Sequence, residues 1–256
     1  MPTTIASWNV NSLNVRLPHE LDWLATNQPD VLCLQETKQE DGKFPYEALD
    51  LVGYRALHNG QKTYNGVAIL SRHEIAQPML GIPDFADEQK RVVCATIQDV
   101  RIVCAYFPNG QSVGSEKYLY KLGWLEVFTQ WLQKELEIYP RLALLGDYNI
   151  APEDRDVHDP AAWLGQVHVS EPEREAFRKL VNLGLHDSFR LFEQPEKSFS
   201  WWDYRMAAFR RDLGLRIDHI LVSAPLLAAC KASWIDKAPR KLERPSDHTP
   251  VVLELA

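Results

Sequence analysis

The chain has 256 residues, of which 45% are hydrophobic, so it is long enough to bury a sizeable core. Its formal net charge of -7 does not favour a polyanion binder, yet Lys and Arg gather between Arg205 and Arg244, a cluster that a mixed solvated surface explains equally well. No apolar segment approaches the roughly 18 residues of a membrane span, and no leader-like segment precedes the first apolar run. We therefore expect a cytoplasmic monomer with no membrane association, folded as a single domain over residues 1–256.

Runs rich in Val, Ile and Leu predict strands along the whole chain. They lie at about 3–8, 31–35, 66–71, 91–97, 101–107, 142–146, 217–222 and 250–255. Several of these runs are apolar on both faces, which is typical of strands covered on each side. The pattern predicts a layered α/β protein.

Three helices are predicted between these strands. Leu17, Leu21 and Leu24 repeat at helical spacing, in a helix that ends before Pro29. A longer apolar face runs over residues 122–136 and stops at Pro140. The third helix begins at Ser170 with Glu173 three positions on, a capping box, and stops at Gly184.

Polar side chains follow several predicted strands at the point where each apolar run stops. They are Asn9 and Asn11, Glu36, Asp147 and Asn149, Asp218, and the pair Asp247 and His248. Strand ends of this kind line one rim of a sheet, where a pocket can form. Oxygen ligands with one imidazole suit a hard divalent cation and the hydrolysis of a phosphate ester.

Each of these residues has an ordinary structural explanation when it is considered alone. Glu36 fits a strand-end acid in contact with Lys38, the segment after Gly146 fits a polar turn, and an Asp-His pair fits a surface loop. Adjacent residues on a strand point to opposite faces, so Asp218 is better suited than Asp247 to orient the imidazole of His248.

The segment Phe199–Arg205 packs three aromatic residues and an Arg into seven positions. This composition suits stacking on a sugar or base beside a phosphate, although a half-buried strand explains it equally well. Tyr106 ends an apolar run and can offer its hydroxyl to a phosphate oxygen or lie at the rim.

Eight motifs together resemble the exonuclease III and apurinic/apyrimidinic (AP) endonuclease family, within the fold shared with DNase I and the inositol polyphosphate 5-phosphatases. In chain order they are Trp8–Leu13, Leu34–Lys38, Gly66–Arg72, Tyr106–Gly110, Gly146–Pro152, Trp201–Arg205, Gly214–Asp218 and Ser246–Pro250. The resemblance implies a four-layer α/β sandwich, with two mixed sheets face to face and helices outside. It also implies a Mg²⁺-dependent cut, with Mn²⁺ as a substitute, on the 5′ side of a nucleotide or abasic residue that leaves a 3′-hydroxyl. The implied substrate is double-stranded DNA with abasic sites, nicks, gaps or 3′ ends.

The resemblance also assigns roles to matching positions. Glu36 and Asp247 would hold Mg²⁺ with Asn11 nearby, and Asp147 with Asn149 would position or activate water. His248, oriented by Asp218, would bind the scissile phosphate or relay a proton. Further residues implied to contact phosphate oxygens are Asn9, Tyr106 and Asn109. The pocket for a flipped-out, baseless sugar would fall on Trp201, Leu215 and Ile217, and contacts to the DNA backbone on Arg72, Lys121 and Arg205.

Two positions depart from the family pattern. Asn11 replaces the Asp of some relatives, which removes one charge near the metal. His168 stands where many relatives carry Ser or Gly, and a bulky imidazole there can stack on a terminal base pair or obstruct continuous duplex. We hypothesise that His168, with Gln111, biases the enzyme towards 3′-end trimming, and a surface histidine without effect is the alternative.

Two other functions are compatible with parts of this pattern. A phosphatase acting on a phosphorylated lipid or inositol would keep the same core, but Trp201–Arg205 and Gly214–Asp218 resemble the DNA-repair branch. A non-catalytic nucleic-acid binding module would show gaps in the polar set, and none is seen.

Overall fold

Fourteen strands form two six-stranded sheets and one short ribbon in the computed structural model, which describes residues 1–256. The first sheet has the strand order β13 (Cys230–Ile235), β14 (Val251–Leu255), β1 (Thr4–Asn9), β2 (Val31–Gln35), β4 (Val67–Ser71) and β3 (Arg55–Asn59). The second has the order β5 (Ile75–Leu80), β6 (Val92–Ile97), β7 (Val100–Tyr106), β8 (Leu142–Asp147), β12 (Asp218–Ser223) and β9 (Leu185–Asp187). The ribbon pairs β10 (Trp201–Trp202) with β11 (Gly214–Leu215). Parallel and antiparallel neighbours occur in both sheets, so both are mixed.

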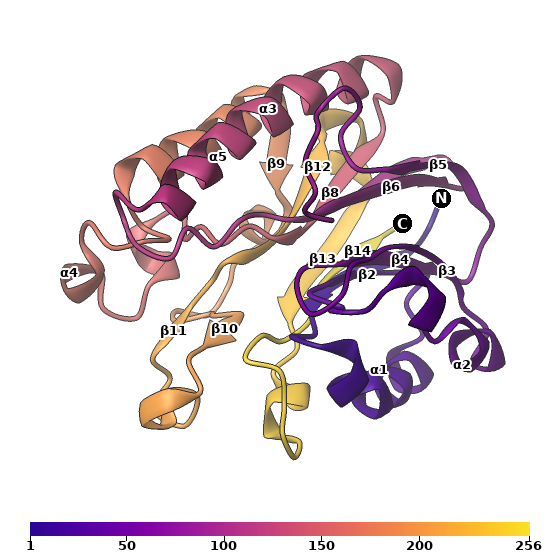
Figure 1. Ribbon diagram of the computed structural model, residues 1–256, viewed down its shortest axis with the longest axis horizontal. Coiled ribbons are helices and arrows are strands. Elements are labelled where there is room, and N and C mark those ends of the chain that lie inside the picture. Colours follow the sequence, from indigo (N-terminus) through magenta and orange to yellow (C-terminus); the bar gives the residue numbers. More distant parts are fainter.

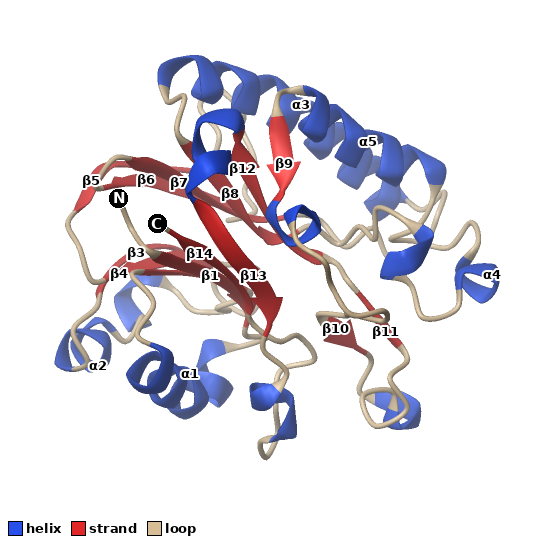
Figure 2. Cartoon of the chain, turned by 180° about the vertical axis from the view of Figure 1, so that it is seen from behind, coloured by secondary structure: helices blue, strands red, loops and turns tan.

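The two sheets pack face to face, and helices cover their outer faces (Figures 1 and 2). The largest apolar cluster lies between the sheets, with Ile5 and Cys33 from one side and Val93 and Ile102 from the other. The helices α1 (Leu13–Asn27) and α2 (Tyr46–Leu51) cover the first sheet, while α3 (Glu116–Ile138) and α5 (Glu171–Asn182) cover the second. The short α4 (Pro160–Trp163) lies at the periphery. This is the four-layer α/β sandwich that the sequence predicts.

The three predicted helices are present, and the longest of them begins earlier than its apolar residues predict. The capping box at Ser170 and Glu173 opens α5 as predicted. The long helix α3 begins at Glu116, well before residue 122, because the Ser115 hydroxyl accepts a hydrogen bond from the Tyr118 N–H. The strands β3, β5 and β13 were not predicted, since their residues are only partly buried and their apolar runs are short.

Strand direction brings distant residues to one end of the sandwich. The pairs β1 with β2 and β7 with β8 are parallel, so their carboxyl ends lie at the same edge of each sheet. Strand β12 is antiparallel to β8 and begins with Asp218 opposite Asp147. The β10–β11 ribbon and the loop 237–246 project from this end, side by side (Figure 1). None of the helices combines the length and apolarity that a membrane crossing needs.

Candidate active site

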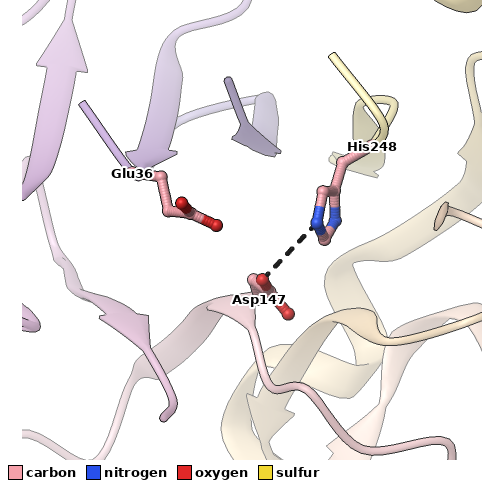
Figure 3. A group of neighbouring side chains, drawn as sticks. All are labelled: Glu36, Asp147 and His248. Carbon is pink, nitrogen blue, oxygen red and sulfur yellow. Dashed lines mark ion pairs between the residues drawn. The ribbon is translucent and has the colours of Figure 1, made fainter. Parts of the chain in front are cut away.

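Three side chains from different strand ends converge at this edge. Ligand atoms of Glu36, Asp147 and His248 all lie within 4.8 Å of one another, and Figure 3 shows the three side chains pointing toward a common centre. Glu36 directly follows β2, Asp147 ends β8, and His248 precedes β14. The convergence joins the two sheets, because Glu36 and His248 come from the first and Asp147 from the second.

Asn9 connects the two carboxylates of this group. Its Nδ2 donates to Glu36 Oε1 at 2.9 Å and to Asp147 Oδ2 at 2.9 Å, and its Oδ1 accepts the Asn11 N–H. Both N–H groups of the amide are therefore occupied. Asn9 therefore links the two carboxylates, and its implied contact with a phosphate oxygen stays a prediction.

A glycine and an asparagine set the position of Asp147. A Cβ atom on Gly146 would lie 1.8 Å from the Ala105 carbonyl oxygen, so only glycine permits this spacing of β7 and β8. Asn149 has a left-handed backbone, and its N–H donates to Asp147 Oδ1 at 2.9 Å. The Asn149 side chain donates to the Phe107 carbonyl and accepts from Asn109. Asp147 is thus held by the turn that follows it, and that turn is bonded to the segment after β7.

His248 is oriented by Asp218. Its Nδ1 lies 2.9 Å from Asp218 Oδ2, while its Nε2 faces Asp147 Oδ2 at 3.7 Å. The buried Ser200 hydroxyl donates to the same Asp218 oxygen at 2.6 Å and accepts the Ile217 and Asp218 N–H groups. Ser200 was not singled out from the sequence, because one serine beside an aromatic run carries no signal.

The charges of this buried group shift its ionisation. Burial acts to lower the pKa of His248, but the carboxylates of Asp218 and Asp147 outweigh that effect and raise it. Burial raises the pKa of Asp147, and Asp218 and Glu36 add to the rise while His248 opposes it. Burial, Glu36 and Asp147 also raise the pKa of Tyr106, so its hydroxyl keeps its proton. The site therefore combines a protonated imidazole with an excess of negative charge.

Asp247 lies beside the three converging residues rather than among them. Its Oδ1 accepts from Asn11 Nδ2 at 2.9 Å, and its Oδ2 accepts from the Trp201 ring N–H at 3.0 Å. Burial would raise the pKa of Asp247, but His248 and these two hydrogen bonds lower it. The group of ligand atoms within 4.8 Å of one another contains Glu36 with Asp147 and His248, and does not contain Asp247.

The donor atoms present fit a hard divalent cation. Carboxylate and amide oxygens are the ligands that such ions prefer. The Lys38 ammonium lies 2.9 Å from Glu36 Oε2 and 2.6 Å from Asn11 Oδ1, so a positive charge already stands between two of these donors. Both the predicted metal role of Glu36 and its predicted contact with Lys38 are compatible with this arrangement.

A groove of about 670 Å³ opens beside this group. Its wall includes Tyr106, Asn109 and Gln111, three of the predicted substrate contacts. Arg91, which no sequence motif indicates, lies in the same wall with its guanidinium 4.8 Å from the Tyr106 ring centroid. The groove thus offers polar and cationic groups next to the converging carboxylates.

The predicted sugar pocket is closed. Leu215 and Ile217 are fully buried in a cluster with Ala151, Val157 and Val169, so they have no free surface for a sugar. His168 lies beside this cluster, its ring centroid 6.5 Å from each of the partly exposed Trp163 and Trp201.

His168 is a fixed, buried residue and not a surface histidine. Its Nδ1 lies 2.7 Å from the Asn149 carbonyl oxygen, and its backbone is left-handed with φ 76°. Burial, helped by Lys121, lowers its pKa to about 3, so the ring is neutral. Contact with the Asn149 carbonyl ties this ring to the loop that carries Asp147.

The three predicted contacts to the DNA backbone have different surroundings. Arg205 has an 84% exposed side chain, paired with Asp203, and is free to meet a phosphate. Lys121 is fully buried: its ammonium bonds to Glu173 and to the carbonyls of Asn109 and Asn149, so it cannot contact DNA. Arg72 lies at the opposite end of the first sheet, since β4 runs antiparallel to β2, and it bonds to the Gln28 carbonyl.

Two further residues hold the site together. The Ser246 hydroxyl donates to the Asn9 carbonyl at 2.7 Å and accepts the His248 N–H. Arg16 in α1 donates to the Asn11 and Pro245 carbonyls and to the Tyr204 hydroxyl. These contacts connect segments far apart in the sequence, and no local pattern indicates them.

Comparison with known proteins gives a consistent result. The model of the Endonuclease/Exonuclease/phosphatase family matches residues 6–248. Exodeoxyribonuclease III of Haemophilus influenzae is 38% identical over 262 residues, which cover 97% of this chain and 98% of the relative.

Solved structures are similar over nearly the whole chain. The 3′ phosphatase NExo from Neisseria, bound to a product DNA hairpin, is 46% identical with a TM-score of 0.97, covering 99% of both chains. An AP endonuclease from Archaeoglobus fulgidus is 38% identical with a TM-score of 0.95, also covering 99% of both. The chain is therefore a nuclease of the exodeoxyribonuclease III type and belongs to the Endonuclease/Exonuclease/phosphatase family.

Proposed function

We propose that this chain is a Mg²⁺-dependent DNA-repair nuclease that hydrolyses phosphodiesters in double-stranded DNA and leaves 3′-hydroxyl ends. It acts as a monomer, as a 3′–5′ exodeoxyribonuclease and on abasic sites, with a bias to 3′-end processing. The observation that carries the proposal is the convergence of Glu36, Asp147 and His248 within 4.8 Å at the edge where the two sheets meet. This set supplies the carboxylates and the proton donor that phosphoryl transfer to water requires.

We assign different roles in hydrolysis to these residues. Glu36 and Asp247, with Asn11, would hold the cation, which when bound supplies positive charge where the phosphate becomes more negative. Asp147, fixed by Asn9 and Asn149, orients a water and accepts its proton. His248 is kept protonated by Asp218 and stabilises the charge on the scissile phosphate.

The bias to 3′ ends rests on His168. A flipped, baseless sugar needs space beside Trp201, Leu215 and Ile217, where the two aliphatic side chains are buried and the His168 ring lies next to Trp201. Opening that space would require movement of a buried ring bonded to the Asn149 carbonyl. At a 3′ end no strand continues past the cut, so the same ring can stack on the terminal base pair. The Neisseria relative named as a 3′ phosphatase supports a function at 3′ ends.

A gel assay tests the activity. Duplexes with a recessed 3′ end, a 3′ mismatch, a 3′-phosphate or an internal abasic analogue are incubated with Mg²⁺ or with EDTA, beside an inositol phosphate as a non-DNA substrate. We expect Mg²⁺-dependent shortening or trimming of the 3′ ends and less cleavage at the abasic analogue. If phosphate is released from inositol phosphate and no DNA is cut, the chain is a small-molecule phosphatase. If DNA is bound but not hydrolysed, the chain is a nucleic-acid binding module.

Two variants complete this test. Asp147→Asn removes the proton acceptor, so we expect loss of cutting with DNA binding retained; undiminished cutting by this variant would refute its role. His168→Ser removes the ring beside Trp201, so we expect abasic cleavage to rise relative to 3′ trimming. Equal exonuclease rates in wild type and His168→Ser, with no gain in abasic cleavage, would remove the proposed bias.

A further inference from the structure

Glu36 sits in a backbone conformation that side chains rarely adopt. Its φ is 52°, and that of Lys38 two residues later is 53°, both in the left-handed region. Such conformations persist only where surrounding contacts hold them. Backbone bonds from Thr37 N–H to the Gly66 carbonyl and from Lys38 N–H to the Asn65 carbonyl supply part of that support.

The residue between the two, Thr37, is completely buried and has a polar side chain. Its hydroxyl lies 2.9 Å from the Nε2 atom of His58, which is a buried residue of β3. A Cβ atom on Gly66 would lie 2.2 Å from the same hydroxyl, so only glycine at position 66 leaves space for the Thr37 side chain in this place. The contact with His58 thus fixes the segment that carries Glu36.

His58 is in turn held on three sides. Its ring stacks on Phe44 with centroids 4.1 Å apart, and a Cβ atom on Gly60 would lie 2.1 Å from its Cε1. Its Nδ1 lies 2.9 Å from Asp41 Oδ1. The ring is therefore packed against Phe44 and lies so close to the backbone of Gly60 that no side chain fits at position 60.

The hydrogen-bonding direction follows from charge. Burial lowers the pKa of His58 to about 4 although Asp41 opposes this, so the ring is neutral at pH 7 and carries one N–H. The negative charge of Asp41, 2.9 Å from Nδ1, favours the proton on that nitrogen, although the N–H is not aligned for a hydrogen bond. Nε2 is then an acceptor, and the Thr37 hydroxyl donates to it.

We propose that His58 is a positioning residue for Glu36: the connected side chains Asp41, His58 and Thr37 hold the left-handed turn that aims the Glu36 carboxylate at the cation. The inference rests on the proposed function, because it concerns the affinity for Mg²⁺. Replacing a residue that orients a metal ligand through a contact outside the coordination shell commonly lowers the affinity for the metal 10- to 100-fold.

Calorimetric titration of the metal-free full chain with MgCl₂ tests this. Thr37→Val removes the hydroxyl at nearly constant shape, and His58→Phe keeps a ring to stack on Phe44 but removes the acceptor. We expect each to raise the Kd for Mg²⁺ about tenfold, with the double variant no weaker than the singles because both remove one bond. The kcat for 3′-end cleavage should recover at saturating Mg²⁺.

Two controls separate positioning from general destabilisation. Thr37→Ser keeps the hydroxyl and should retain the wild-type Kd. If His58→Phe does not fold, the comparison of Thr37→Ser with Thr37→Val still tests the inference. His73→Phe removes a histidine bonded to Asp30 at the opposite end of the same sheet, and should leave the Kd unchanged. Folded Thr37→Val with a Kd within twofold of wild type, or additive effects in the double variant, would overturn the inference. A wild-type chain that binds no Mg²⁺ would reject the proposed function as well.

Discussion

Asp218 at the start of β12 and His248 before β14 connect the two sheets, with the His248 Nδ1 atom 2.9 Å from Asp218 Oδ2 and 3.1 Å from Oδ1. Both donors around this carboxylate need an acceptor, since the Ser200 hydroxyl also donates to Oδ2. Asparagine at position 218 would present an N–H to one of them. We expect Asp218→Asn to lower kcat by between about 10² and 10⁴, with a much smaller change in KM.

The pH profile of the same variant checks the cause. Because the carboxylates raise the pKa of His248, the wild type keeps the imidazolium to high pH. Removing the charge at position 218 lowers that pKa, so the alkaline decline in kcat should move to lower pH. Asp203→Asn, which alters the partly exposed partner of Arg205, serves as the control and should match the wild type. An unchanged alkaline limb in Asp218→Asn would contradict the proposed role of the pair.

Lys121 and Arg205 should respond in opposite ways to replacement. Lys121→Met leaves Glu173 as an unpaired buried charge, so we expect a loss of about 3 kcal/mol in the free energy of unfolding. The salt dependence of DNA binding should not change, because the ammonium reaches no phosphate. Arg205→Ala should leave stability unchanged and reduce the slope of log K against log salt by about one. Urea unfolding and DNA binding at several salt concentrations distinguish the two, and a reduced slope in Lys121→Met would contradict its structural assignment.

The sequence predicts those parts of the site that follow from strand direction. Glu36 and Asp147 lie at the carboxyl ends of strands that are parallel to a neighbour, so the rule that such ends share an edge places Glu36 near Asn9 in the first sheet and Asp147 beside Tyr106 in the second. The two edges meet only because the sheets pack face to face, which the family resemblance implies and strand direction alone does not. The same rule explains the error at Arg72, since it ends an antiparallel strand whose direction the apolar run alone does not reveal.

Errors at buried polar residues have a different cause. Lys121 lies on the face of α3 that also buries Trp124 and Phe128. A lysine side chain is nevertheless expected to be exposed to solvent unless a buried partner for its charge is known. That partner, Glu173, is 52 residues away in the sequence. His58 and Ser200 were missed for the same reason: their contacts are non-local and each side chain is ordinary by itself.

Asn11 offers a test of the charge at the metal site. As asparagine it donates to Asp247 Oδ1 at 2.9 Å, which an aspartate cannot do. Asn11→Asp would place a second carboxylate beside Asp247, so the metal-free protein should lose about 1 kcal/mol or more of stability while its Kd for Mg²⁺ falls. Thermal unfolding with and without Mg²⁺ measures both effects. Equal stabilisation by Mg²⁺ in Asn11→Asp and wild type would show that position 11 does not contact the cation.

Glu20 makes stability depend on pH at a place remote from the strand-end carboxylates. This residue of α1 is fully buried, neither carboxyl oxygen has a hydrogen-bond partner, and burial raises its pKa from 4.5 to about 8. The folded state therefore binds more protons than the unfolded state between these values, so stability falls as the pH rises from 4.5 toward 8, by about 1.4 kcal/mol per pH unit at most. Glu20→Gln carries no charge at position 20, so its stability should not fall in this way.

We expect urea midpoints of Glu20→Gln and wild type to agree near pH 4.5 and to separate progressively up to pH 8, with the variant more stable. The exposed Glu47→Gln in α2 should follow the wild type throughout, and a parallel decline of Glu20→Gln would show that the carboxyl is not the source of the pH dependence.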